Sequence, residues 1–133
     1  MSRELIDSNA RNWAAACHLA GLLAVAGAPF GNLIGPLVLF LLKKDEHPFI
    51  ARAGRESLNF QIFVTLCATI LFAAFVATVI DAIARNAPPW GAVVILPALV
   101  ALALLDVISV LIAAVRTSNG EDYSYSISLR FVR

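Results

Sequence analysis

The chain has 133 residues, of which 60% are hydrophobic and 14% are charged, and its mean hydropathy is +0.83. Soluble domains carry about a quarter charged residues, so most of this protein's surface must face lipid. A net charge of +1 provides no broad positive surface for nucleic acid. We therefore expect a single membrane domain over residues 1–133, with no nucleic-acid partner and no length left for a separate catalytic domain.

Three long stretches of the chain carry no charged residue: Trp13–Leu42, Ser57–Ile80 and Asn86–Leu105. A helix of about 20 apolar residues crosses a hydrocarbon layer roughly 30 Å thick. Short charged segments separate the stretches, as connecting loops would. The sequence therefore predicts an integral membrane protein whose first partner is the lipid bilayer.

The first uncharged stretch is too long for one crossing, because its length as a continuous helix would be about 45 Å. Pro29 lies in its middle between Gly27 and Gly31, and proline cannot donate to a helical ladder. A break there predicts one helix over 8–27 and a shorter helix over 33–43. The shorter helix would be only ~15 Å long, so we expect it to be re-entrant, to lie in thinned bilayer, or to be shielded by protein.

The basic residues predict how the chain is oriented. They gather in the leader, in the loop before the second stretch and in the tail, at Arg3, Arg11, Lys43, Lys44, Arg52, Arg55, Arg116, Arg130 and Arg133. The connector between Asp81 and Trp90 holds only Arg85. Lys and Arg near the ends of membrane helices favour the cytoplasmic side, so a hairpin in the first stretch, which brings both termini to the cytoplasm, explains the pattern best.

Two further helices are expected, over 48–84 and 89–117. Pro48 suits the first turn of the former, and Trp90 suits the outer interface at the start of the latter, where Pro97 predicts a kink. The fold class is thus all-α: an integral membrane helical bundle of four helical segments, made of a broken first hairpin and two full spans. A short extended tail over 118–133 follows on the cytoplasmic side.

Asp106 is the sharpest candidate for chemistry, because it lies about 15 Å inside the last helix, near the bilayer midplane. An aspartate there costs about 2.5 to 3.5 kcal/mol on insertion scales, which implies an inward-facing position that it shares with Ser109. It is either a proton- or ion-binding carboxylate or a hydrogen-bonded packing residue. Gln61 and Thr65 form a second polar face, which serves helix adhesion or, if it converges with Asp106, a polar path.

Other polar residues near the helix ends are Glu56, Asn59 and His18. We expect them at the membrane interface, where they can bond across helices or pack. The two histidines match no metal-ligand spacing, and no nucleophile, phosphate-loop or dinucleotide motif is present in the sequence. The sequence thus predicts no enzyme, no cofactor, no metal and no identifiable small-molecule substrate.

Two segments are candidates for contact with other molecules. The basic residues Lys43, Lys44, Arg52 and Arg55 form a candidate site for lipid headgroups or a partner. In the tail, Tyr123, Tyr125, Ile127, Leu129 and Phe131 alternate with serines and Arg130. This period of two predicts an extended strand, which must dock on the chain's own basic loop, on the membrane surface, or on the sheet edge of a partner.

Several short elements resemble a known family. They are His18-Leu19-Ala20-Gly21-Leu22, Pro29-Phe30-Gly31-Asn32, Ile34-Gly35-Pro36-Leu37, Lys43-Lys44-Asp45, Pro48-Phe49, Glu56 with Leu58-Asn59-Phe60-Gln61, Asn119-Gly120, Tyr123, Tyr125, Arg130 and Phe131. The chain resembles the small bacterial Tic-twenty-like membrane proteins of unknown function, which are distantly related to the chloroplast inner-envelope import component. The resemblance implies a four-helix fold in a bacterial cytoplasmic (inner) membrane and a translocation or channel role. Ala53 and Ser126 depart from the family pattern, which often has His and Pro there.

Two functional hypotheses follow. The first is a non-enzymatic accessory, scaffold or assembly subunit of a membrane complex, which contacts another membrane protein or a second copy through its basic loop and tail. The alternative is a pore, transporter or protein-translocation component with a polar path near Asp106.

Overall fold

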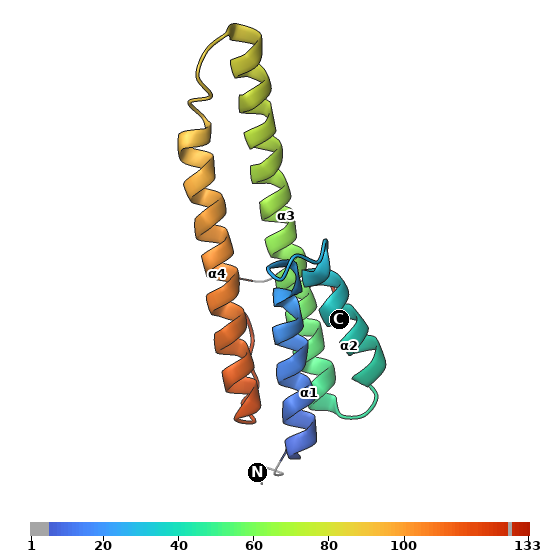
Figure 1. The fold of residues 1–133 in the computed structure, drawn as a ribbon. Helices are drawn as coiled ribbons and strands as arrows, with labels where there is room; N and C mark the ends of the chain where they lie inside the picture. Colours follow the sequence, from blue (N-terminus) through green and yellow to red (C-terminus); the bar gives the residue numbers. More distant parts are fainter. Residues whose placement is uncertain (1–5, 128) are drawn as a thin grey trace. The chain divides into compact units, whose positions relative to one another are not determined.

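The computed structural model describes residues 6–127 and 129–133, so Arg3 of the leader and Ser128 of the tail lie outside the described part. Within these ranges the chain forms four α-helices and one 3-10 helix (Figure 1). They are α1 (Ser8–Leu19), η1 (Ala20–Ala24), α2 (Gly31–Lys43), α3 (Pro48–Arg85) and α4 (Ala92–Ser118). This arrangement confirms the all-α class with four helical segments.

The chain divides into two compact units, and both long helices contribute to each. Unit 1 holds residues 1–63 and 107–133, and unit 2 holds residues 64–106. Each unit is described separately below.

Unit 2 is an antiparallel pair formed by the second part of α3 and the first part of α4, with residues 86–91 between them. Gly91, just before α4, lies so close to the methyl group of Thr78 on α3 that a Cβ atom would clash. The absence of a side chain therefore lets these two segments approach each other closely. Large apolar side chains such as Ile70, Ile83 and Val94 are exposed. Both α3 and α4 are long and apolar enough to cross a bilayer, and their apolar surfaces are mostly uncovered by protein. The chain is an integral membrane protein in which these surfaces face lipid.

Unit 1 contains the broken hairpin, which lies beside the start of α3 (Figure 1). The helix expected over 8–27 is α-helical through Leu19 and continues as the tighter η1 through Ala24. The chain then reverses at two residues with positive φ, Gly27 at 92° and Phe30 at 55°. The second arm, α2, begins at Gly31, and it passes through Pro36 to Lys43.

Small residues allow the arms of the hairpin to approach each other and α3. A Cβ atom on Gly35 would stand 2.7 Å from the backbone oxygen of Ala20, so only glycine fits at this crossing. On the α3 side, the core joins small residues of α1 to two large residues and one alanine of α3. Its buried members are Ala10, Ala14, Cys17, Phe49, Ile50 and Ala53. Close backbone approach of this kind is how membrane helices gain packing energy.

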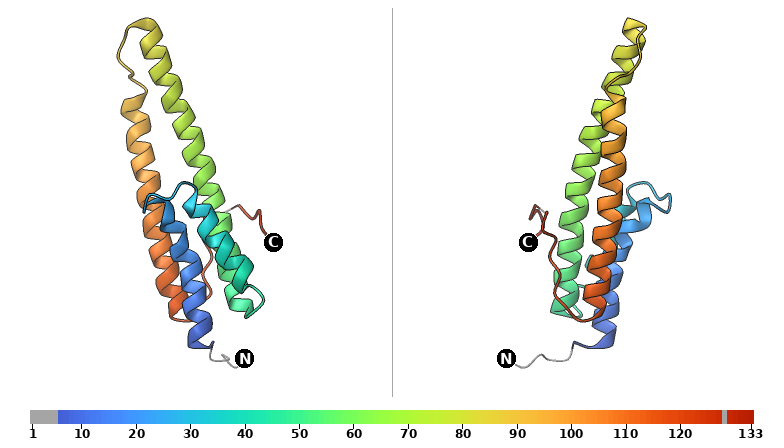
Figure 2. Two further views of the ribbon diagram at one scale, coloured as in Figure 1. Left: turned by 45° about the vertical axis from the view of Figure 1, so that its right-hand side comes forward. Right: turned by 90° about the vertical axis from the view of Figure 1, so that its left-hand side faces the viewer.

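The tail leaves α4 at Gly120 and returns along the start of α3, within unit 1 (Figure 2). The strand that the alternation predicts does not form among the described tail residues, and a bend at Ser126 and Ile127 interrupts the extended chain. The reason is the hydrogen-bond partner: the tail bonds to a side chain of α3 and not to a second strand, so no ladder can develop.

Candidate functional site

Gln61 of α3 fixes the hairpin to the long helix. Its Oε1 accepts a hydrogen bond of 3.1 Å from Nδ2 of Asn32, at the start of α2. Its amide also lies against Gly21 of η1, where an added Cβ atom would stand 2.6 Å from Nε2. One fully buried side chain therefore contacts both arms of the hairpin. The structure gives Gln61 an adhesive contact, which is one of the two roles that the sequence left open.

A second buried bond ties α1 to α3. The Ser57 hydroxyl donates to the carbonyl oxygen of Cys17 at 2.8 Å, and the exposed fraction of each residue is 0%. The acceptor lies close to the point where α1 gives way to η1. Carbonyls near a helix end need such a partner when they are buried, so Ser57 stabilises the change of helix type.

His18 joins α1 to the tail. Its Nδ1 shares a hydrogen bond of 2.9 Å with the hydroxyl of Tyr125, and His18 has no exposed surface. The ring of Tyr125 stacks on Phe60 of α3, with centroids 4.0 Å apart and planes 4° apart, while Tyr123 meets it edge-on at 5.0 Å. The two tail tyrosines thus pack inward on the protein's own helices. Offset and edge-on aromatic pairs add about 0.5–1.5 kcal/mol each beyond burial.

Asn59 holds the far end of the tail. Its Oδ1 accepts hydrogen bonds from the backbone N–H groups of Phe131, at 2.9 Å, and Val132, at 2.7 Å. Its Nδ2 donates in return to the carbonyl oxygen of Val132 at 3.0 Å. A single amide side chain therefore pairs with tail backbone as a neighbouring strand would, and it fixes where residues 130–133 lie.

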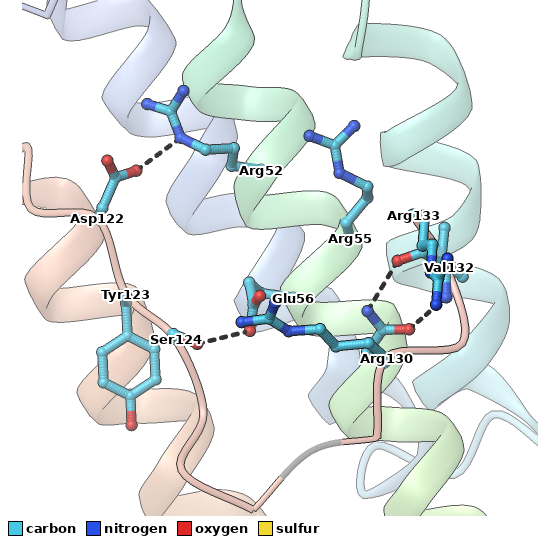
Figure 3. Close-up of a pocket in the computed structure, with 10 residues that line it drawn as sticks. Arg52, Arg55, Glu56, Asp122, Tyr123, Ser124, Arg130, Val132 and Arg133 are labelled. Atoms are coloured by element: carbon cyan, nitrogen blue, oxygen red, sulfur yellow. Dashed lines mark hydrogen bonds and ion pairs between the residues drawn. The ribbon is translucent and has the colours of Figure 1, made fainter.

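The docked tail and α3 line an open pocket of about 520 Å³, which we name the arginine pocket (Figure 3). It is lined by Arg52, Arg55, Glu56, Asn59, Asp122, Tyr123, Ser124, Arg130, Val132 and Arg133. Asp122 forms an ion pair with Nε of Arg52 at 2.9 Å, and Glu56 accepts a hydrogen bond from the Ser124 hydroxyl at 3.2 Å. Both contacts join the tail to α3, so they hold the pocket's two walls together.

The side chains of the arginine pocket carry an excess of positive charge. Four arginines face two carboxylates, which leaves a side-chain charge of +2 (4 − 2). One arginine, Arg52, is paired with Asp122. Within the described part of the chain, no ion pair is formed by Arg55, Arg130 or Arg133. Such a pocket attracts an anion, and guanidinium groups can bind phosphate or carboxylate oxygens in pairs.

The two lysines expected to act with these arginines lie elsewhere, at the end of α2. Lys43 pairs with Glu46 at 2.7 Å and lies over the ring of Trp13, while Lys44 lies over the ring of Phe40. The basic loop therefore separates into two groups, and only Arg52 and Arg55 line the pocket.

The remaining polar candidates belong to the long helices. Asp106 is 7% exposed and lies in unit 2, as does Thr65, whose carbonyl oxygen accepts a bond of 2.8 Å from the hydroxyl of Thr69. Ser109 is half-buried and, like Gln61, lies in unit 1. Among the described residues, no group of three or more His, Cys, Asp or Glu side chains could hold a metal ion.

Five residues of the arginine pocket escaped the sequence analysis as site residues: Asp122, Ser124, Arg130, Val132 and Arg133. The alternation of the tail places Arg130 on the polar face of an extended segment, which is a usable signal. The sequence alone holds no sign of the direction in which the tail returns, and that direction brings these residues to α3.

These features define an all-helical integral membrane protein with two helices long and apolar enough to span a bilayer, a short broken hairpin and a tail that folds back to line a cationic pocket. The chain belongs to the MamF/MmsF family, the magnetosome magnetite crystal formation protein family, whose model matches residues 9–132. No curated protein and no solved structure matched the chain.

The family match corrects the resemblance drawn from the sequence. The Tic-twenty-like assignment is wrong, because a model of a different family covers almost the whole chain. The argument for a protein-translocation role rested on that resemblance and is withdrawn with it.

Proposed function

We propose that this protein is a non-enzymatic accessory or assembly subunit of a membrane complex that takes part in magnetosome magnetite crystal formation. Membership of the family supports a part in crystal formation, and the contacts of the tail support action as an assembly subunit. The protein would act by holding another membrane protein, or a second copy of itself, against its docked tail.

The exposed apolar side chains of the docked tail carry this proposal. Ile127, Leu129 and Phe131 are 54%, 54% and 50% exposed, although Tyr125 of the same tail is buried. At the far end of this row, Asn59 holds the backbone of Phe131 and Val132. A fixed backbone that presents a row of apolar side chains is a surface for a partner, since docking then costs little further ordering.

The test is complementation in a magnetosome-forming bacterium that lacks its own member of this family. The triple variant Ile127→Ser, Leu129→Ser, Phe131→Ser removes the apolar row and leaves Asn59 in place. Leu42→Ser is the matched control, because it removes a similarly exposed apolar side chain from α2. We expect the triple variant to lose crosslinked partners and to change crystal size in electron micrographs, and the control to behave as wild type. An unaccompanied monomer with wild-type crystals from the triple variant would refute the proposal.

We further propose that the protein is multi-pass in a bacterial cytoplasmic membrane, with both termini cytoplasmic. The distribution of basic residues supports this orientation, since Arg85, the last residue of α3, is the only one of ten Lys and Arg near the turn between α3 and α4. Single cysteines at positions 7 and 133, in a chain whose two native cysteines are serine, should resist an impermeant thiol reagent in intact cells. A cysteine at position 86 should react, and reaction at position 7 or 133 would reverse the orientation.

A pore or transporter function is the second candidate, and the burial of Asp106 favours it. Asp106 is 7% exposed while its neighbours Leu104 and Leu105 are exposed, so this residue is turned away from lipid. Within unit 2, a polar path would use Asp106 with Thr65. Ion flux in reconstituted vesicles that Asp106→Asn abolishes would support this function, and unchanged flux would remove it.

A further inference from the structure

The arginine pocket lies at the level where α3 becomes apolar. Arg55 and Glu56 are the last charged residues of α3 before the uncharged stretch that begins at Ser57. Asn59, which holds the tail, is one turn further along that stretch. In a membrane protein, the change from charged to uncharged sequence on a spanning helix marks the headgroup layer. The pocket therefore opens where phospholipid phosphates are found.

Its walls offer more charged donors than charged acceptors, since four guanidinium groups face two carboxylates. Arg52 uses Nε for Asp122, and its other guanidinium nitrogens remain available for a ligand. The side chain of Arg55 extends along the same side of the pocket as that of Arg52, and Arg130 extends back from the tail toward Glu56 (Figure 3). Phosphate oxygens match guanidinium donors in charge and geometry, so the negative charge of a phosphodiester would offset part of the excess charge of the pocket.

We propose that the arginine pocket binds the phosphate of an anionic phospholipid headgroup. The ligand class is a glycerophospholipid with a net negative charge, such as phosphatidylglycerol or cardiolipin. A pocket of about 520 Å³ has the size of ordinary small-molecule sites, which is ample for one headgroup. This site does not depend on the proposed assembly role, because its ligand comes from the bilayer and not from a partner protein.

The site is complete only when the tail is docked. Arg52 and Arg55 come from α3, whereas Arg130 and Arg133 come from the tail and are placed there by Asn59. Releasing the tail would remove half of the guanidinium groups without changing the charge of the protein. This dependence separates a built site from the general attraction of basic residues for an anionic surface.

The experiment is a native mass spectrometry titration of the full-length protein in neutral detergent micelles. The probes are dioctanoyl phosphatidylglycerol and dioctanoyl phosphatidylcholine, and inorganic phosphate is the competitor. We expect one phosphatidylglycerol to bind selectively. The double variant Arg55→Gln, Arg130→Gln should weaken it about 25-fold, at about fivefold for each arginine. The matched double variant Lys44→Gln, Arg85→Gln removes the same charge outside the pocket and should change binding by less than about twofold.

The variant Asn59→Ala distinguishes the pocket from diffuse charge. It keeps every charged residue, and we expect it to weaken phosphatidylglycerol at least about tenfold because Arg130 and Arg133 leave the site. Circular dichroism of each variant checks that the helices remain. Equal binding of phosphatidylcholine would refute the proposal, as would equal losses in the two double variants or wild-type affinity in Asn59→Ala. Displacement by equimolar inorganic phosphate would also refute it, since the ligand would then be a soluble anion.

Discussion

Replacing Asn59 by alanine tests the tail contact most directly. The substitution removes three hydrogen bonds: two from the backbone N–H groups of Phe131 and Val132, and one to the carbonyl oxygen of Val132. A typical hydrogen bond contributes a net ~1 kcal/mol, and Asn59 itself is only 2% exposed, so little water replaces them. We expect the free energy of opening the tail to fall by about 2 to 3 kcal/mol.

Amide hydrogen exchange measures this change residue by residue. A loss of about 2 to 3 kcal/mol corresponds to exchange that is roughly 30- to 150-fold faster at Phe131 and Val132. The amides of α1 and α2 should not change, because their contacts with α3 do not involve Asn59. The control Ser124→Ala removes one long, exposed bond to Glu56 and should speed tail exchange by less than about fivefold.

Two results would refute the reasoning. If Phe131 and Val132 exchange at wild-type rates in Asn59→Ala, the amide does not hold the tail. If exchange instead rises equally throughout the tail and the hairpin, the variant has loosened unit 1 as a whole, and no specific contact has been measured.

Three further predictions concern the bonds and close contacts of unit 1. Tyr125→Phe removes the bond to His18 and keeps the ring stack, so exchange of the tail amides near it should become about fivefold faster. Tyr125→Ala also removes the stack on Phe60, and the increase should be at least tenfold larger; equal effects of the two variants would show that the stack does not stabilise the tail. Gly35→Ala places a Cβ atom 2.7 Å from the backbone oxygen of Ala20 and should lower stability by about 1 to 3 kcal/mol in thermal unfolding in detergent; an unchanged midpoint would show that the arms separate freely. Ser57→Ala removes the buried hydrogen bond to the carbonyl oxygen of Cys17 and should cost about 1 kcal/mol in the same assay, and no loss would mean that this bond does not stabilise the contact of α1 with α3.

The fold was largely readable from the sequence because its strongest signals are local. The break in the first stretch follows from Pro29 and the glycines around it, and the chain does reverse between Gly27 and Phe30. The change to a 3-10 helix at Ala20 was not predicted. It depends on how η1 packs against Gln61 and α2, and such contacts have no signature in the local sequence.

The tail was predicted less well, because its structure depends on contacts distant in sequence. Strict alternation favours a strand, but a strand needs a partner with free backbone groups, and the tail meets the side chain of Asn59 instead. The bend at Ser126 and Ile127 then divides the alternating face, so that Tyr125 points inward while Ile127 and those after it are exposed. The period of two therefore predicted the extended conformation of the tail but not the direction in which its side chains point.

The mistaken family assignment has a structural explanation. Several of the residues that suggested it hold the fold together: His18 binds the tail, Gly35 allows the hairpin to close, and Asn59 and Gln61 bind the tail and the hairpin. Residues with such roles are shaped by the packing of a small helical bundle. They identify an architecture, and architecture alone does not identify a function.

The two proposals use different faces of the same tail, and this makes them separable. Along an extended segment neighbouring side chains point to opposite sides, so Arg130 lines the pocket while Leu129 and Phe131 remain exposed. Substituting the apolar row should therefore remove a protein partner and leave phosphatidylglycerol bound. The double variant Arg55→Gln, Arg130→Gln should weaken phosphatidylglycerol and leave the protein partner bound. Asn59→Ala should impair both, because the backbone that carries both faces is held by that one amide. A variant set that failed to follow this pattern would show that the docked tail is not the common support of the two surfaces.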